Sequence, residues 1–274
     1  MKKRSTLVTG TLFSLFALTL FSCKKSDDAS PEVEPPVVTE TRPLLDSVIT
    51  ISSNPEWNEA TAYRYNADST QAADIYISTG QLNGVFLLYK NKQLTRYVYS
   101  PTGNINDSTD VYMCSYDSKG RLAIINPDNW GNRDSLVYND ANQLVRRYKF
   151  YSNELEYADT LTWTGKNLTA YRSVQRIYGG TENDVYIQTW TFKYDEQKNP
   201  YQGVPSSSFF YQEDRWKLSE NNAVEVAYQV TNGVSHNIRY AYTYNDKHYP
   251  ASAAYVKTGE GVSDDGTVRF VYRK

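Results

Sequence analysis

The sequence is poor in the residue types from which most metal and redox sites are built. Its 274 residues include two cysteines, two histidines and two methionines. Two cysteines exclude a disulfide scaffold and a multi-cysteine zinc module. The histidines, His236 and His248, have no paired nucleophile in the sequence, and we interpret them as a strand-end residue and a turn residue. The composition therefore predicts a protein that has no metal or cofactor and is not an enzyme.

Tyrosine, in contrast, is abundant. The chain contains 25 tyrosines, and aromatic residues make up 14% of it. Disordered proteins are poor in aromatic residues. We therefore expect a folded domain that follows the N-terminal segment.

The N-terminal 22 residues have the features of an export signal. Lys2 to Arg4 form a positive segment, and the apolar stretch Leu7–Leu20 is too short to span a bilayer comfortably. The stretch ends in Leu-Phe-Ser-Cys23, which resembles the lipobox of bacterial lipoproteins. That resemblance implies a signal peptide over 1–22 and acylation of Cys23. The alternative is an ordinary secretory signal with a chance cysteine.

Residues 23–44 are predicted to be a disordered tether, because they are rich in proline and glutamate and cannot bury a core. The tract Lys24-Lys-Ser-Asp-Asp28 resembles the segment that marks surface-exposed lipoproteins of the Bacteroidota. It implies an outer-membrane protein that is anchored by its lipid and faces the cell surface. A solvated charge run that keeps the lipid end of the chain extended is the plain physical alternative.

The predicted mature chain has no excess of positive charge. Removal of residues 1–22 takes away three basic residues and no acid, which leaves 26 basic against 31 acidic residues, a net charge of −5. Nucleic-acid binding requires basic patches, so we expect the lipid anchor to bring the chain to the membrane and expect no nucleic-acid partner.

From residue 45 onward the sequence alternates with a period of two between turn signals, which indicates β-strands over 45–274. Three aromatic sets illustrate the alternation, since the members of each would share one strand face. The sets are Tyr112, Cys114 and Tyr116; Trp190, Phe192 and Tyr194; and Tyr240, Tyr242 and Tyr244. A helical turn is expected only within 206–218, and Cys114 is expected to be a small core residue.

The turns repeat a pattern in which an aromatic residue ends one strand, a polar turn with glycine or asparagine follows, and a leucine or isoleucine opens the return strand. The copies begin at Tyr99, Tyr116, Tyr138 and Trp163, with later echoes over Tyr194–Pro200 and Tyr244–Pro250. This loose internal repeat predicts a series of β-hairpins.

The run Tyr116-Asp-Ser-Lys-Gly-Arg-Leu122 resembles the YD repeat of Rhs-type proteins, and the whole series is similar to Bacteroidota lipoproteins built from such hairpins. With the alternation, this resemblance implies an all-β domain, an antiparallel meander that forms a long twisted sheet. We expect the sheet to be sandwich-like or an open barrel.

Three tryptophans, Trp57, Trp130 and Trp216, are candidates for stacking against sugar rings. The alternative is that they form cross-strand packing pairs. Five Asp-Ser/Thr sites resemble the O-glycosylation sequon of exported Bacteroidota proteins, with Ser47, Ser69, Ser108, Ser135 and Thr160 as acceptors. Asp-Ser/Thr pairs also form local turn hydrogen bonds, so both interpretations stay open.

Two groups of carboxylates were weighed as functional sites. Glu154 and Glu156 lie two apart, but a retaining glycosidase needs carboxyl groups about 5 Å apart across a cleft, and a solvated strand is the simpler interpretation. The oxygen-rich loops 104–110 and 128–134 lack the spacing of a calcium-binding EF-hand loop.

The sequence therefore leaves two functions open. The first is a non-catalytic binding or structural module of a cell-envelope lipoprotein, with a glycan or a surface protein as partner. The second is a glycan-binding accessory protein or glycoside hydrolase of a polysaccharide-utilisation system.

Overall fold

The computed structural model describes residues 42–126, 131–177, 185–202, 212–231 and 233–273, which contain sixteen β-strands and three short 3₁₀ helices. The strands are β1 (Leu45–Ser52), β2 (Glu59–Tyr65), β3 (Gln71–Ser78), β4 (Gln81–Lys90), β5 (Gln93–Ser100), β6 (Asp110–Tyr116), β7 (Leu122–Asn126), β8 (Arg133–Tyr138), β9 (Leu144–Tyr151), β10 (Glu154–Thr164), β11 (Asn167–Arg176), β12 (Val185–Lys198), β13 (Asn221–Val230), β14 (His236–Tyr244), β15 (Pro250–Gly259) and β16 (Val262–Tyr272). The helices are η1 (Pro55–Trp57), η2 (Ile105–Asp107) and η3 (Gln212–Leu218). None of the described helices is long and apolar enough to cross a membrane.

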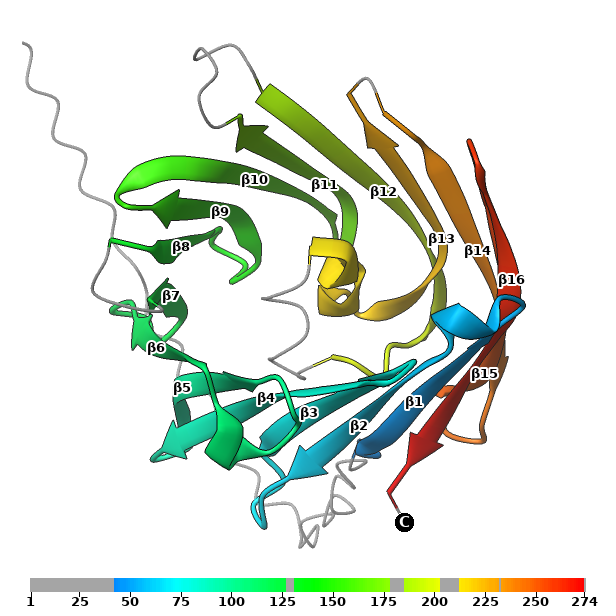
Figure 1. Ribbon diagram of the computed structural model, residues 1–274, viewed down its shortest axis with the longest axis horizontal. Coiled ribbons are helices and arrows are strands. Elements are labelled where there is room, and N and C mark those ends of the chain that lie inside the picture. Colours follow the sequence, from blue (N-terminus) through cyan, green and yellow to red (C-terminus); the bar gives the residue numbers. More distant parts are fainter. Residues whose placement is uncertain (1–41, 127–130, 178–184, 203–211, 232, 274) are drawn as a thin grey trace, which may run out of the picture. The chain divides into compact units, whose positions relative to one another are not determined.

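The sheet is an antiparallel meander that closes into a barrel (Figure 1). Each strand pairs with its neighbours in sequence, and β1 also pairs with β16, with Val48 opposite Phe270. The predicted all-β meander is confirmed. The expected sandwich-like or open-barrel form is wrong, because β1 and β16 pair and close the sheet, which leaves no exposed sheet edge among the described strands.

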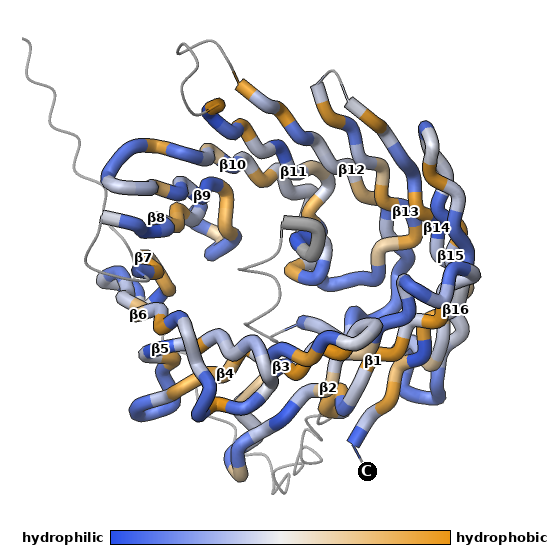
Figure 2. Tube along the Cα trace, in the orientation of Figure 1, coloured by the Kyte–Doolittle hydropathy of each residue, from blue (hydrophilic) through white to orange (hydrophobic). Residues whose placement is uncertain are grey.

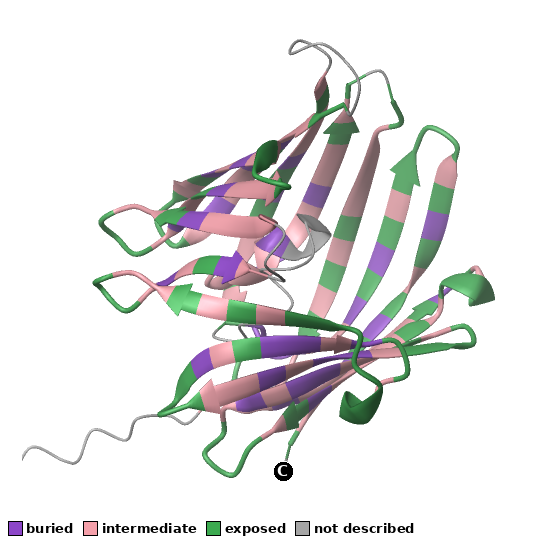
Figure 3. Ribbon diagram, turned by 60° about the vertical axis from the view of Figure 1, so that its left-hand side comes forward, coloured by how far each residue is buried: buried purple, intermediate pink, exposed green. Residues whose placement is uncertain are grey.

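Strand residues alternate between the interior and the outer wall, as the period-two pattern predicts (Figure 3). The three predicted aromatic sets all face inward, where Tyr112, Cys114, Trp190, Phe192 and Tyr240 pack in or against the core. Cys114 is half-buried. Apolar and polar residues alternate along many of the strands (Figure 2), whereas β4 and β7 have continuous apolar stretches over 85–88 and 122–125.

The barrel has two different ends. Turns from even to odd strands lie at what we call the tyrosine end, and turns from odd to even strands lie at the loop end. At the tyrosine end Asp117 accepts hydrogen bonds from the amides of Lys119 and Arg121, and Gly120 has a φ of +75°. Asn142 takes the same position in the next even-to-odd turn, with a φ of +60°. The predicted glycine-or-asparagine turns are therefore confirmed at these sites.

Two copies of the turn pattern were assigned wrongly. Tyr99 ends an odd strand, so its turn lies at the loop end, and Ile105 falls in η2 instead of opening a strand. The expected reversal over Tyr194–Pro200 is also absent, because β12 continues to Lys198 and β13 begins only at Asn221. A repeat motif does not show on which barrel end a turn falls, nor whether an insertion follows the aromatic residue.

A hydrogen bond links successive strand pairs at the tyrosine end. In each case the aromatic residue of an even strand donates a side-chain hydrogen bond to a backbone carbonyl where the preceding odd strand begins. The seven pairs are Tyr65–Leu45, Tyr116–Leu94, Tyr138–Leu122, Trp163–Leu144, Tyr194–Leu168, Tyr242–Ala223 and Tyr272–Pro250, with donor–acceptor distances of 2.6 to 3.0 Å. The aromatic residue that marks each turn thus has a structural role: its ring packs in the interior while its polar atom satisfies a carbonyl.

Between β12 and β13 the chain does not form a tight turn, and the described residues 199–202 and 212–220 pack inside the barrel. Figure 1 shows η3 (yellow) inside the ring of strands. Asn199, 1% exposed, fixes the start of the segment, since its amide donates to the carbonyl of Ser219 at 2.9 Å and accepts from the amide of Tyr201 at 2.9 Å. Within the predicted range 206–218, the helical turn is confirmed over Gln212–Leu218; residues 206–211 lie outside the described part of the chain.

A buried group of charges supports η3 from the sheet. Arg147 is 2.9 Å from the carboxylate of Asp134 and 3.4 Å from that of Asp159. Arg215 of η3 is fully buried, and its guanidinium lies 5.7 Å from the centre of the Tyr171 ring. Burial, together with the nearby charge of Arg147, lowers the pKa of Arg215. The inner wall is therefore polar where it holds η3, and each of these aspartates is compensated by arginine.

Candidate functional site

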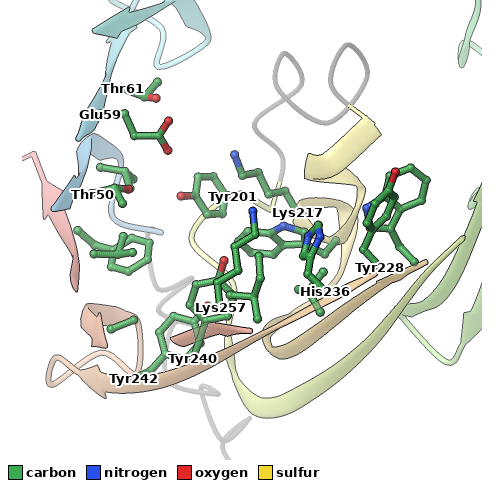
Figure 4. Close-up of a pocket in the computed structure, with 18 of the residues that line it drawn as sticks. Thr50, Glu59, Thr61, Tyr201, Lys217, Tyr228, His236, Tyr240, Tyr242 and Lys257 are labelled. Carbon is green, nitrogen blue, oxygen red and sulfur yellow. The ribbon is translucent and has the colours of Figure 1, made fainter. Parts of the chain in front are cut away.

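A cavity of about 520 Å³ lies inside the barrel between β1–β2, β12–β16 and η3 (Figure 4). Its residues come from both walls: Thr61 from β2, Trp190 from β12, Tyr240 from β14 and Lys257 from β15. The volume is typical of small-molecule sites.

Strand alternation places these side chains. On β14 His236, Ile238, Tyr240 and Tyr242 occur at every second position, and all four line the cavity. Arg239, between two of them, is exposed. Glu59, His236 and Lys257 stand near the strand termini at the loop end, so the cavity extends to that end of the barrel.

Aromatic rings form two walls of the cavity. On one side the centre of the Trp190 ring lies 4.9 Å from that of Tyr228, and the ring of His236 lies 4.8 Å from Tyr228. On the other side Trp216 lies 5.6 Å from Tyr201 in an edge-to-face contact. These spacings are those of packed aromatic pairs, which hold the rings in place before any ligand arrives.

The insertion closes the deep side of the cavity. Trp216 packs against both interior clusters, the one that contains Trp190 and the one that contains Tyr63 and Phe270. The same helix brings Lys217 into the cavity. The β12–β13 segment therefore builds the site and also fills the barrel.

Among the described residues, two ammonium groups and one carboxylate line the cavity. The Lys217 ammonium lies 4.7 Å from the centre of the Tyr201 ring and 5.8 Å from that of Trp216. Lys257 comes from the opposite strands and lies near His236. The carboxylate of Glu59 accepts a hydrogen bond from the hydroxyl of Tyr76 at 2.7 Å.

His236 is held in its neutral form. Burial lowers the pKa of its imidazole, and the positive charge of Lys257 lowers it further. At neutral pH the side chain therefore offers the cavity one donor and one acceptor instead of a charge.

The three tryptophan candidates for sugar stacking do not lie at one site. Trp216 lines the cavity, whereas Trp57 is 47% exposed in η1 at the loop end. Trp130 lies outside the described residues, as does the predicted acylation site Cys23.

The five predicted modification sites fall into two structural groups. Ser69 and Ser108 are exposed in turns, and Ser69 has a φ of +65°. The other three, Ser47, Ser135 and Thr160, lie half-buried on strands.

Neighbouring aspartates already have structural uses at three of the sites. Asp68 accepts hydrogen bonds from the amide and the hydroxyl of Thr70, as in a local turn motif. Asp134 and Asp159 precede two of the candidate acceptors, and both face the interior, where they bind Arg147. The structural interpretation therefore accounts for part of the sequence pattern, and the modification stays a prediction.

The carboxylate pair and the described parts of the oxygen-rich loops do not line the cavity. Glu156 forms an ion pair with Lys149 at 3.2 Å, and Glu154 is exposed. In the loop over 104–110, Asn104 caps η2 and Asp107 accepts a hydrogen bond from Thr102 at 2.7 Å. Residues 128–130 of the second loop lie outside the described part of the chain.

Sequence reasoning missed Lys217, Lys257 and Tyr201 as site residues. For Lys257 a signal existed, because Ala253, Tyr255 and Lys257 share one strand face in the alternating pattern. Lys217 and Tyr201 gave no such signal, since they lie in an irregular segment whose path into the barrel is set by tertiary contacts.

The chain is similar to known proteins in structure and not in sequence. Neither the protein-family models nor the curated proteins contain a match to this sequence. Among solved structures the chain is similar to a porin-like protein from Bacteroides uniformis, with 13% sequence identity and a TM-score of 0.46 over 84% of this chain and 96% of that one.

Proposed function

We propose that this chain is a lipid-anchored protein of the outer membrane that faces the cell surface and binds a small ligand, without catalysis, inside its barrel. The observation that carries the proposal is the aromatic-lined cavity of about 520 Å³. A largely preformed, concave, aromatic site with a few polar groups is the usual form of a small-molecule site.

The polarity of the outer wall supports attachment through the lipid and not through insertion of the barrel. Lys193, Glu225 and Arg239 lie on neighbouring strands of the outer wall, with Glu225 3.0 Å from Lys193 and 3.4 Å from Arg239. A membrane-spanning barrel needs an apolar band around its circumference, and charged residues on the lipid face are costly. Exposed apolar residues are scattered over strands around the barrel, from Ile51 on β1 through Met113 on β6 to Val256 on β15.

The position of the cavity fits such an anchor. The described chain enters the barrel at Arg42, and Arg273 donates a backbone hydrogen bond to Leu44 at 2.9 Å, so both described termini lie at the tyrosine end. The cavity extends to the loop end. A ligand would therefore approach from the end of the barrel opposite to Arg42 and Arg273, the two ends of the described chain.

The alternative, a glycan-binding accessory protein or glycoside hydrolase, also has some support. Trp216 and Tyr240 provide flat apolar faces of the kind that stack on sugar rings. Hydrolysis has less support, because Glu59 is the single carboxylate that lines the cavity among the described residues, and a glycosidase uses two.

The test is to fill the cavity. In Thr61→Trp an indole would project into the space from the middle of β2, whereas the matched control Ala60→Trp puts the same side chain on the opposite face of the same strand. The wild type and both variants, each as the full chain, are screened against a mixed library of neutral, anionic and cationic small molecules. The measurement is the shift in melting temperature that each compound causes.

We expect compounds that stabilise the wild type and Ala60→Trp but not Thr61→Trp. Binding that survives in Thr61→Trp, or a library without any stabilising compound, would contradict the proposed function. Release of sugar fragments from an offered oligosaccharide would favour the hydrolase instead.

A further inference from the structure

The charges of the cavity wall are balanced, which narrows the class of ligand that the cavity fits; this inference rests on the proposed binding function. Lys257 on β15 stands directly opposite Asp264 on β16, so the two side chains share the inner face. Asp264 is 5% exposed. Its carboxylate accepts hydrogen bonds from the hydroxyls of Ser52, Ser53 and Tyr255 at 2.6 to 3.0 Å.

These hydrogen bonds keep Asp264 ionised. Burial disfavours the charged form of its carboxyl group, but the three hydroxyls outweigh burial and lower the pKa of Asp264 below its ordinary value. A negative charge is therefore fixed in the wall beside Lys257, where it offsets the positive charge of that lysine.

The other charged groups of the lining are engaged as well. The Lys217 ammonium lies over two aromatic rings, and Lys217 has a further interaction in the structure. The carboxylate of Glu59 accepts the hydrogen bond from Tyr76. Among the described residues, the two ammonium groups of the lining are thus matched by two carboxylates, those of Glu59 and Asp264. A ligand with a net charge would upset this balance inside the barrel, where an uncompensated charge is costly.

Two walls of the cavity differ in chemistry. Thr50, Glu59 and Thr61 lie together on β1–β2, where the register pairs Thr50 with Glu59 (Figure 4). Within the described part of the chain, neither threonine hydroxyl has a hydrogen-bond partner. Across the space stands Tyr228, with the ring of Trp190 packed against it. One wall therefore offers hydrogen bonds, and the opposite wall offers apolar ring faces.

This contrast matches the chemistry of an uncharged sugar ring. The hydroxyls of such a ring donate to the carboxylate of Glu59, and they both donate to and accept from Thr50 and Thr61. The C–H groups on its flat face lie against the negative face of an aromatic ring. A purely apolar ligand would instead bury the polar groups of β1–β2 without partners, which is costly.

The shape of the cavity restricts how a sugar enters it. Trp216 closes the deep side, and the cavity extends to the loop end of the barrel. A site that holds the middle of a polymer has to be open at both ends. We propose that the cavity binds an uncharged sugar ring end-on, either a free monosaccharide or the terminal ring of an oligosaccharide, since both present the same ring to the walls.

The experiment measures binding to the full chain by calorimetry and saturation-transfer NMR. The neutral probes are glucose, galactose, mannose, xylose and N-acetylglucosamine, together with the disaccharides maltose, cellobiose and lactose. Glucuronate, galacturonate and glucosamine are the charged counterparts, since each adds one charge to a ring of the same shape. The disaccharides separate the two sources of the ring.

Two matched variants place the sugar in the cavity. Thr61→Val removes one hydroxyl from the polar wall and keeps the branched side chain. Thr191→Val makes the same change at an exposed position on the outer face of β12, and it is the control. Both substitutions suit a β-strand, so both variants are expected to fold.

We expect at least one neutral sugar to bind more tightly than its charged counterparts, with an affinity that does not change as salt rises. Thr61→Val should weaken that binding about fivefold, because one hydrogen bond to the ligand is lost, and Thr191→Val should leave it unchanged. A disaccharide that binds better than its monosaccharide identifies the terminal ring of a chain, and the reverse order identifies a free sugar.

Tighter binding of glucuronate, galacturonate or glucosamine than of the neutral sugars would overturn the proposal. Unchanged binding in Thr61→Val, or no binding by any neutral sugar, would do the same. These outcomes are distinct from failure of the proposed function. A charged or apolar compound that stabilises Ala60→Trp but not Thr61→Trp would keep the binding function and reject the neutral sugar.

Discussion

The hydroxyl group of Tyr138 donates a 2.8 Å hydrogen bond to the backbone carbonyl of Leu122. Leu122 ends one copy of the Tyr-to-Leu turn pattern, and Tyr138 begins the next. Tyr116 makes the corresponding bond to Leu94. The repeat in the sequence is thus a chain of contacts in which the aromatic residue of each copy binds the strand opened by the previous one.

Tyr138→Phe should destabilise the barrel by about 1 kcal/mol, because the ring stays packed while the carbonyl of Leu122 loses its partner. Tyr151→Phe is the matched control, since Tyr151 is 59% exposed on the barrel surface, and its stability should match the wild type. Denaturant unfolding of the two variants measures the difference. Equal stability would show that the hydrogen bond contributes nothing.

Gly120→Ala should cost about 1 kcal/mol in unfolding free energy, since a Cβ at a φ of +75° is strained although no atom lies within 4 Å of it. Gly120→Asn should cost less, because the equivalent residue Asn142 already adopts a φ of +60°. Chemical unfolding ranks the wild type and both variants. A Gly120→Asn protein less stable than Gly120→Ala would refute the equivalence of the two turns.

Stability should fall steeply in alkaline solution. Burial raises the pKa of Tyr116 and Tyr138 to about 12, with the charge of Cys114 adding to the first. Both groups have a higher pKa in the folded chain than the ordinary value of 10, so their contribution is complete below pH 10 and is lost as the pH rises through about 12. Tyrosinate absorbance and far-UV circular dichroism, followed together, test this. Full tyrosine ionisation near pH 10 with the fold intact would contradict it.

The thiol of Cys114 should react slowly in the folded chain, because burial raises its pKa to about 11 and leaves little thiolate at pH 8. A Cys23→Ser background makes Cys114 the one remaining thiol. Labelling with a thiol reagent should be slow in buffer and fast in denaturant. Equal rates in both would place the side chain in free contact with solvent.

Cys23→Ser should release the protein from the membrane fraction when it is expressed in a Gram-negative host that acylates lipoproteins, because the lipid chains are the proposed anchor. Ser26→Ala, three residues later, should stay in the membrane fraction. Fractionation and immunoblotting provide the readout. Continued full sedimentation of Cys23→Ser with membranes would argue for attachment through the barrel.

The sequence alone determined the local features of this protein. The alternation at Tyr240, Tyr242 and Tyr244 placed them on one strand face, and Gly120 and Asn142 marked turns with positive φ. These properties depend on the backbone of a few consecutive residues, so they can be read without a structure. The helical turn near Trp216 was visible for the same reason.

The tertiary structure decided the closure of the barrel and the existence of the cavity. Closure depends on the pairing of Val48 with Phe270, which are far apart in the chain and carry no pattern that identifies each other. That Lys217 and Lys257 line one cavity depends in turn on the contacts that hold η3 inside the barrel. The scarcity of cysteine and histidine therefore limited the chemistry that could be expected, while the interior charges became apparent only when distant strands came together.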